Sequence, residues 1–213
     1  MRDEDEDDEK DLDPDDEPGE SPEGPKAESG GKNFALTQLL KTRTLLLDEA
    51  ITQESFRKFA EALLLLESVD ATLPITLVVN TYGGREASAF ATHDLIRCAR
   101  APIRTLANGV VGGVATLVYC AVARERRFST PSSTFLLHQS SGGAGGAASD
   151  VEVGAAELQK VKNQVLTRLA DAAGQSVERL DRDTRRKLTL DTRGAREYGL
   201  VGHIITRRTE LAL

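Results

Sequence analysis

The sequence has few of the residues that cross-link secreted domains or build metal centres. Its two cysteines, Cys98 and Cys120, are too few for a disulfide framework or a zinc quartet, and no other metal-ligand pattern is visible. We expect both to be small buried residues in a reducing compartment, and we expect no metal. Tryptophan is absent, aromatic residues make up 4% of the chain, and there is no basic run, so nothing favours nucleic-acid binding.

The chain also lacks signals for export or membrane insertion. Its first residues are acidic, whereas a secretory signal begins with basic and then apolar residues. Residues 109–123 form an apolar stretch of 15 residues, which is shorter than the roughly 20 that a spanning helix needs. We therefore expect a cytoplasmic protein without membrane contact.

Charge is distributed unevenly along the chain. Residues 1–32 hold 15 of the 34 acidic residues but only 4 of the 27 basic ones, a net charge of −11. Residues 33–213 therefore carry a net charge of +4. A segment with many like charges and few apolar residues cannot form a core, so we predict a disordered acidic tail over 1–32 and one folded domain over 33–213.

Within this domain, predicted strands alternate with predicted helices, which favours an α/β fold with mostly parallel strand pairing. The strands are expected at residues 44–47, 75–79, 103–107, 133–137 and 201–206. The helices are expected at residues 53–67, 86–100, up to about 123, 150–172, 176–187 and 193–198. Ser149 and Ser176 are expected to cap the last two long helices, and Gly174 is expected to end the first of these.

Two predicted turns are rich in glycine and follow strands, at residues 81–84 and 108–113. The first amides of a helix have no partner within the helix, so two such turns side by side would suit the negative oxygen of an acyl-transfer intermediate. The alternative is that the glycines only permit tight turns and close packing.

The order of these motifs resembles that of ClpP, the proteolytic subunit of the ATP-dependent Clp protease. The matching stretches are 79–84 (VNTYGG), the turn at Gly109 with its helix, 127–128 (RF), 137–139 (LHQ), 142–143 (GG), 174–176 (GQS), 182–184 (RDT) and 197–201 (EYGLV). The resemblance implies the ClpP/crotonase superhelix of repeated strand–strand–helix units. It also implies a protruding handle, a strand and helix over 142–173, that joins two seven-membered rings.

The catalytic triad that this resemblance implies is degenerate. ClpP proteins use serine, histidine and aspartate, and only His138 matches. Gly113 stands at the serine position, and counting without gaps from residues 182–184 places Lys187 at the aspartate position. Glycine has no nucleophilic atom, and a lysine would oppose an imidazolium instead of orienting it. The oxyanion donors would be the backbone amides of Gly84 and Val114.

Other residues offer no clear replacement for the missing triad members. Thr116 and Cys120 are expected deeper in the helix, and Ser140 and Ser141 follow His138 without a position opposite it. Asp183 and Asp191 flank Lys187, and either would lie within possible reach of the histidine. His93 and His203 match no motif position and are interpreted as ordinary structural residues.

Three functional hypotheses follow from the sequence. The first is a catalytically inactive ClpP-like subunit with a structural or regulatory role in a homo- or hetero-oligomeric ring, which a AAA+ unfoldase would serve. The second is an active ATP-dependent serine endopeptidase that uses an unpredicted residue. The third is a crotonase-like acyl-CoA enzyme, because residues 107–113 (ANGVVGG) resemble the crotonase glycine motif. No cofactor is expected in the chain itself.

The acidic tail bears on the composition of such a ring. In ClpP proteins the N-terminal segment lines the axial entrance, so seven tails in a homomeric ring would bring about 77 negative charges together. Their repulsion at low salt favours a mixed ring with few copies, or tails directed away from the pore. The alternative is that the tail only aids solubility.

Overall fold

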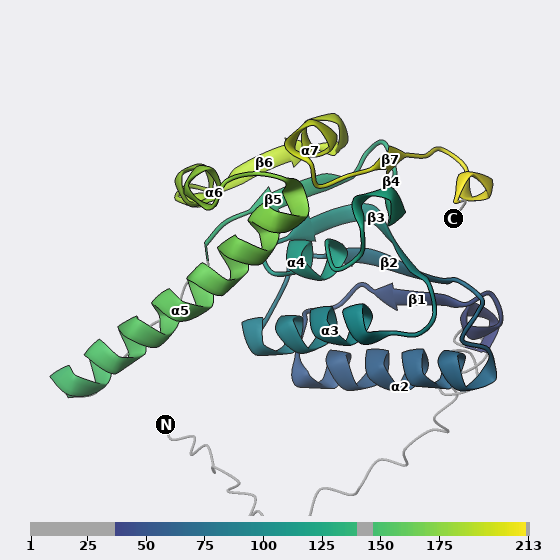
Figure 1. The fold of residues 1–213 in the computed structure, drawn as a ribbon, viewed down its shortest axis with the longest axis horizontal. Coiled ribbons are helices and arrows are strands. Elements are labelled where there is room, and N and C mark those ends of the chain that lie inside the picture. The colour runs from purple at the N-terminus through teal and green to yellow at the C-terminus, as the bar shows by residue number, and fades with distance from the viewer. Residues whose placement is uncertain (1–36, 140–146, 212–213) are drawn as a thin grey trace, which may run out of the picture.

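The computed structural model describes residues 37–139 and 147–211, and it shows one sheet with helices on both sides (Figure 1). In this part of the chain the sheet has seven strands. They are β1 (Thr44–Leu47), β2 (Ile75–Thr81), β3 (Ile103–Gly112), β4 (Arg127–Ser129), β5 (Thr134–Leu137), β6 (Leu188–Asp191) and β7 (His203–Ile204).

The strand order is β1-β2-β3-β4-β7, and every pair along this path is parallel. β3 is long enough to pair twice, with β4 through Thr105–Ala107 and with β5 through Val110–Gly112. β6 then pairs antiparallel with β5, with Leu137 opposite Leu188. The predicted α/β fold with mostly parallel pairing is therefore confirmed, and β5–β6 is the antiparallel exception.

Helices connect the strands. They are α2 (Gln53–Val69), α3 (Glu86–Cys98), α4 (Ala115–Tyr119), α5 (Ala148–Ala173), α6 (Val177–Thr184) and α7 (Thr192–Tyr198), with the short 3₁₀ turns η1 (Arg124–Arg126) and η2 (Arg208–Glu210). Figure 1 shows α2 and α3 side by side below β1 and β2, and α6 and α7 on the opposite side of the molecule. Among the helices described, none combines the length and apolar character needed to cross a bilayer.

The core forms where β2 meets the apolar face of α2. Ile75, Leu77 and Val79 alternate along β2 and are fully buried, as the two-residue period of a strand requires. On α2, Phe59 and Leu63 face the core at a spacing of four residues, which brings them to one side of the helix. The helix begins with a capping box in which Thr52 and Ser55 bond to each other's backbone amides.

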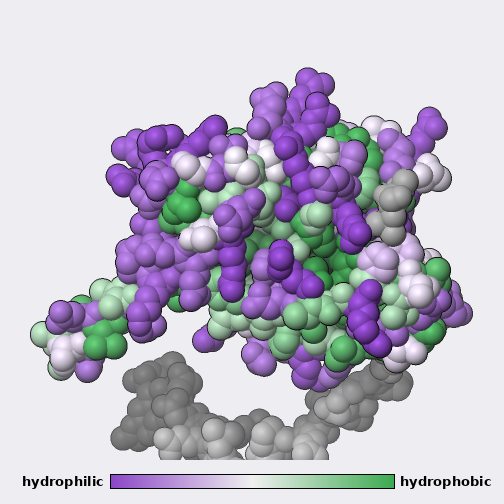
Figure 2. Space-filling view, in the orientation of Figure 1, coloured by the Kyte–Doolittle hydropathy of each residue, from purple (hydrophilic) through white to green (hydrophobic). Residues whose placement is uncertain are grey.

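Helix α5 extends well beyond the sheet (Figure 1). Its 26 residues span about 39 Å, and its buried residues all lie between Val165 and Ala173, in the half nearer the body. The outer half leaves Val151 and Val153 exposed, and Figure 2 shows apolar atoms at this free end. The helix ends at Gly174, which adopts the left-handed conformation and confirms the predicted stop.

Several predicted boundaries were wrong. Asn108 and Gly109 do not form a turn, because β3 continues to Gly112. At Gly109 the pairing with β2 shifts register, φ is +113°, and the Asn80 side chain accepts a hydrogen bond from the Val110 amide. The irregularity is therefore a bulge within a strand, which local sequence does not distinguish from a turn.

Other corrections concern helix ends and small strands. Ser149 lies inside α5, whose N-cap is Ala147, whereas Ser176 caps α6 as predicted. α6 ends at Thr184, before the predicted end at Lys187. The sequence interpretation missed β6, which begins at Leu188, and also β4. Cys98 is exposed and only Cys120 is buried. The predicted disordered tail over 1–32 and residues 142–146 of the predicted handle lie outside the described residues.

Candidate functional site

Gly113 lies just beyond the end of β3, facing the histidine predicted to be its partner. Its amide donates to the Leu136 carbonyl at 2.8 Å, which fixes the turn against β5. Its φ is +50°, a left-handed conformation that glycine adopts without strain. A Cβ atom on Gly113 would lie 3.0 Å from Nε2 of His138. The position expected for the nucleophile therefore faces the imidazole but carries no side chain.

His138 is the residue after β5, and its ring is oriented by backbone. Nδ1 lies 3.1 Å from the carbonyl oxygen of Gln139. A carbonyl oxygen can only accept, so Nδ1 carries the proton of the neutral imidazole, and the lone pair is on Nε2. That lone pair is directed to the side of Gly113. The sequence interpretation missed this role of Gln139. The acceptor is its backbone carbonyl, which every residue has, so the residue type gives no indication of it.

Lys187 lies directly before β6, which pairs with β5. Continuing the register from Leu137–Leu188 by one residue places Lys187 opposite His138. Lys187 is exposed and makes no hydrogen bond or ion pair within the described residues. The antiparallel pairing thus aligns Lys187, which the ungapped count assigned to the aspartate position, with His138.

Neither candidate aspartate contacts His138. Asp183 accepts a hydrogen bond from the Tyr198 hydroxyl at 3.1 Å and pairs with Arg179 and Arg182. Asp191 lies at the other end of β6, opposite Thr134, and caps α7 through the Gly194 amide. Both carboxylates therefore have other partners.

The two predicted oxyanion donors lie at the same pocket. Neither the Gly84 amide nor the Val114 amide donates to another group in the described part of the chain. The two turns touch, since a Cβ atom on Gly83 would lie 3.3 Å from the Val114 nitrogen. A cavity of about 400 Å³ brings these donors together with Gly113, His138, Tyr82, Arg85, Glu86 and Ala87. The sequence interpretation missed the pocket roles of Arg85 and Glu86, which follow the glycine turn.

The alternative nucleophiles are poorly placed. The Thr116 hydroxyl is fully buried and has no hydrogen-bond partner in the described structure. Cys120 is buried as well, and burial raises the pKa of its thiol, which disfavours the reactive thiolate. Ser140 and Ser141 lie outside the described residues.

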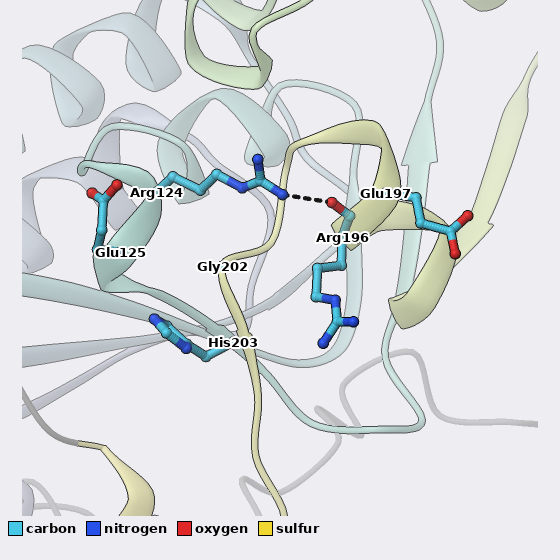
Figure 3. A pocket seen from close by; sticks show the side chains of 6 residues that line it. All are labelled: Arg124, Glu125, Arg196, Glu197, Gly202 and His203. Atoms are coloured by element: carbon cyan, nitrogen blue, oxygen red, sulfur yellow. Dashed lines mark hydrogen bonds between the residues drawn. The ribbon is translucent and has the colours of Figure 1, made fainter.

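The other two histidines lie away from this pocket. His93 is buried on α3, its Nδ1 is 2.7 Å from Asp94, and burial lowers the pKa of its imidazole. His203 stacks on Phe128 and lines a hollow of about 340 Å³ beside Arg124 and Arg196 (Figure 3). In that hollow the Arg124 guanidinium donates to the Arg196 carbonyl, and its lining residues include no serine, threonine or cysteine. No cluster of three metal-ligating side chains occurs among residues 37–139 and 147–211.

Comparisons with known proteins agree with this architecture. The profile of the Clp protease family matches residues 28–208. The ATP-dependent Clp protease proteolytic subunit 2 of Treponema denticola is 32% identical over 192 residues, which cover 90% of this chain and 96% of that protein. Subunit 3 of Rhizobium meliloti is 35% identical over 173 residues, 81% of this chain and 88% of that protein.

A solved structure shows the same fold. The chain of a ClpP1 mutant from Listeria monocytogenes superposes with a TM-score of 0.77 at 31% sequence identity. The match covers 84% of this chain and 99% of the Listeria chain. The described sheet and helices are thus those of a ClpP subunit.

Proposed function

Because the chain belongs to the Clp protease family, we propose that it is a subunit of a Clp protease complex that is inactive as a peptidase. Its role is structural or regulatory within an oligomeric ring, in the cytoplasm, beside ClpP-type subunits and a AAA+ unfoldase. The observation that carries this proposal is the pair of residues around His138: Gly113 faces Nε2 without a nucleophile, and Lys187 lies opposite the ring.

The chemistry of peptide cleavage supports the loss of activity. An acyl-enzyme needs a side-chain oxygen or sulfur, which Gly113 lacks. Release of the amine, which completes acyl-enzyme formation, needs a proton from an imidazolium, and an aspartate normally stabilises that cation. An ammonium at Lys187 opposes it instead. Thr116 on α4 and Cys120 at its C-cap are buried, so neither of these two alternatives offers an exposed nucleophile for an active peptidase.

The free end of α5 supports the proposed role in assembly. α5 projects from the body with Val151 and Val153 exposed, and an exposed apolar end of this kind favours contact with another subunit. In the family the corresponding helix belongs to the handle that joins two rings. The family match and the relatives' names give no support to acyl-CoA chemistry, so the crotonase hypothesis rests only on residues 107–113.

The decisive experiment is mass spectrometry of the intact complex isolated from its source. We expect the chain in a ring with authentic ClpP subunits of the same cell. Val153→Glu places a charge at the free end of α5 and should weaken ring joining, whereas Glu152→Gln nearby should not. A purified protein that stays monomeric and never assembles with those subunits would overturn the proposal.

A further inference from the structure

The pocket around His138 retains most of an acyl-transfer site even without a nucleophile. Nε2 has a free lone pair, because the Gln139 carbonyl holds the proton on Nδ1 at 3.1 Å. Gly84 and Val114 line the same cavity, and their amides have no partners among the described residues. We propose that this pocket hydrolyses activated carboxylic esters by adding water directly, with His138 as the general base.

The geometry around Gly113 gives water access to the base. In a serine enzyme the nucleophile's side chain stands between the imidazole and the substrate carbonyl. Here the point where a Cβ atom would lie is 3.0 Å from Nε2 and 3.4 Å from the Tyr82 carbonyl oxygen, and no side chain occupies it. His138 is exposed, so a water molecule in the pocket can donate a hydrogen bond to Nε2 without displacing protein atoms.

The proposed hydrolysis proceeds in two steps, water attack and collapse of the intermediate, and the pocket has a group that assists each of them. The water oxygen attacks the acyl carbon while Nε2 takes a water proton, and the carbonyl electron pair moves to the oxygen between the Gly84 and Val114 amides. The resulting intermediate then collapses, the ester C–O bond breaks, and the leaving phenolate takes the proton from the imidazolium or from solvent. The net reaction is ester plus water to carboxylic acid plus phenol, which requires no further reactant.

The same site discriminates against peptides. Water attack forms an imidazolium at His138 in either reaction, against the charge of Lys187, but an amide also needs its nitrogen protonated before it can leave. A phenolate leaves without prior protonation, so an aryl ester escapes this requirement. The cavity of about 400 Å³ is at the small end of ligand sites and suits a short acyl chain with one aromatic ring.

The test measures hydrolysis of p-nitrophenyl acetate and p-nitrophenyl butyrate by the full chain. We expect a rate constant per mole of protein about 100-fold above that of free imidazole, because the amides stabilise the oxyanion. His138→Gln, at an exposed position, should lower the rate above background about 100-fold. His203→Gln is the matched control, since it removes another exposed histidine outside the pocket, and it should leave the rate unchanged.

Two further measurements separate water addition from a covalent route. General-base attack predicts slower hydrolysis in D₂O and no initial burst of nitrophenolate. Gly113→Ala should slow the reaction, because the added methyl group would stand 3.0 Å from Nε2. Melting curves of His138→Gln and Gly113→Ala establish that each variant is folded.

Opposite outcomes overturn the inference. They are a burst, a wild-type rate no greater than that of imidazole, or equal rates for wild type and His138→Gln. The ester-hydrolysis inference does not depend on ring assembly, and assembly is measured separately, by the mass of the intact complex. Loss of ester hydrolysis would thus leave the proposed subunit role standing, and failure to assemble would leave the hydrolysis result standing.

Discussion

Nε2 of His138 lies 3.0 Å from the point that a Cβ atom on Gly113 would occupy. A serine side chain at residue 113 would therefore lie close to the imidazole. What would still be missing is a carboxylate on the other side of the ring to accept a hydrogen bond from the imidazole N–H. The register between β5 and β6 puts Lys187 on that side. The two lost triad members thus have different consequences, one for the nucleophile and one for the imidazolium.

The first prediction concerns repair of the triad. Gly113→Ser alone should give little peptidase activity, because Lys187 still opposes the imidazolium. Combined with Lys187→Asp, it should cleave a fluorogenic peptide at least about 100-fold faster than the single variant. At φ +50° the serine should cost about 1 kcal/mol of stability, which a melting curve detects.

A matched control separates the effect of the restored nucleophile from that of backbone strain at residue 113. Gly113→Ala with Lys187→Asp has the same backbone strain but no nucleophile, and it should neither cleave peptides nor react with a fluorophosphonate probe. If Gly113→Ser alone reached the activity of the double variant, the role assigned to Lys187 would be wrong.

The second prediction concerns Arg127, which is buried at the base of α5. Its guanidinium donates to the carbonyls of Cys120, Val122, Ala172 and Leu200. Arg127→Met should leave these buried carbonyls without donors and lower the free energy of unfolding by about 3 kcal/mol. The shift in the urea midpoint measures this loss. Arg126→Met, at an exposed neighbour, should shift it by less than about 0.5 kcal/mol, and equal shifts would contradict the structural role of Arg127.

The third prediction concerns alkaline stability. Burial, and then the hydrogen bond to Asp183, raise the pKa of Tyr198 to about 12 from an ordinary value of 10.0. The folded state therefore holds this proton more tightly than the unfolded state. Its contribution to stability is complete below pH 10 and is lost as the pH rises from about 10 to about 12.

Tyr198→Phe tests this directly. The variant should lose about 1 kcal/mol at neutral pH with the hydrogen bond to Asp183. Its stability should then fall less steeply than that of the wild type between about pH 10 and pH 12, as followed by urea titrations at each pH. Parallel pH profiles for the two proteins would show that Tyr198 is not the group responsible.

The fourth prediction concerns residues 1–32 and their net charge of −11. If the chain forms a homomeric ring, repulsion between the tails should weaken assembly below about 50 mM salt, where screening is weak, and deletion of the tail should restore it. Sedimentation at several salt concentrations measures the effect. Identical assembly of the full and shortened chains at every salt concentration would leave the tail with a solubility role only.

The sequence predicted the larger elements because their patterns are local. Alternating apolar residues in β2, the stripe on α2 and the glycine after α5 each depend on neighbours a few residues away. Two short strands, β4 and β6, were missed. β4 and β6 have three and four residues, and they become strands only because β3 and β5 offer backbone partners.

The sequence by itself also determined which atoms the candidate site lacks, since Gly113 offers no nucleophile in any fold. Tertiary structure alone decided the rest. Pairing between distant strands aligned Lys187 with His138, and the end of β3 lies against the turn at Gly83, where a Cβ atom would be 2.8 Å from the Gly112 carbonyl oxygen. The proton on Nδ1 depends on a backbone carbonyl, and the free amides of Gly84 and Val114 depend on where two turns meet. Such features arise from backbone atoms, which are the same in every residue, so only the fold can place them.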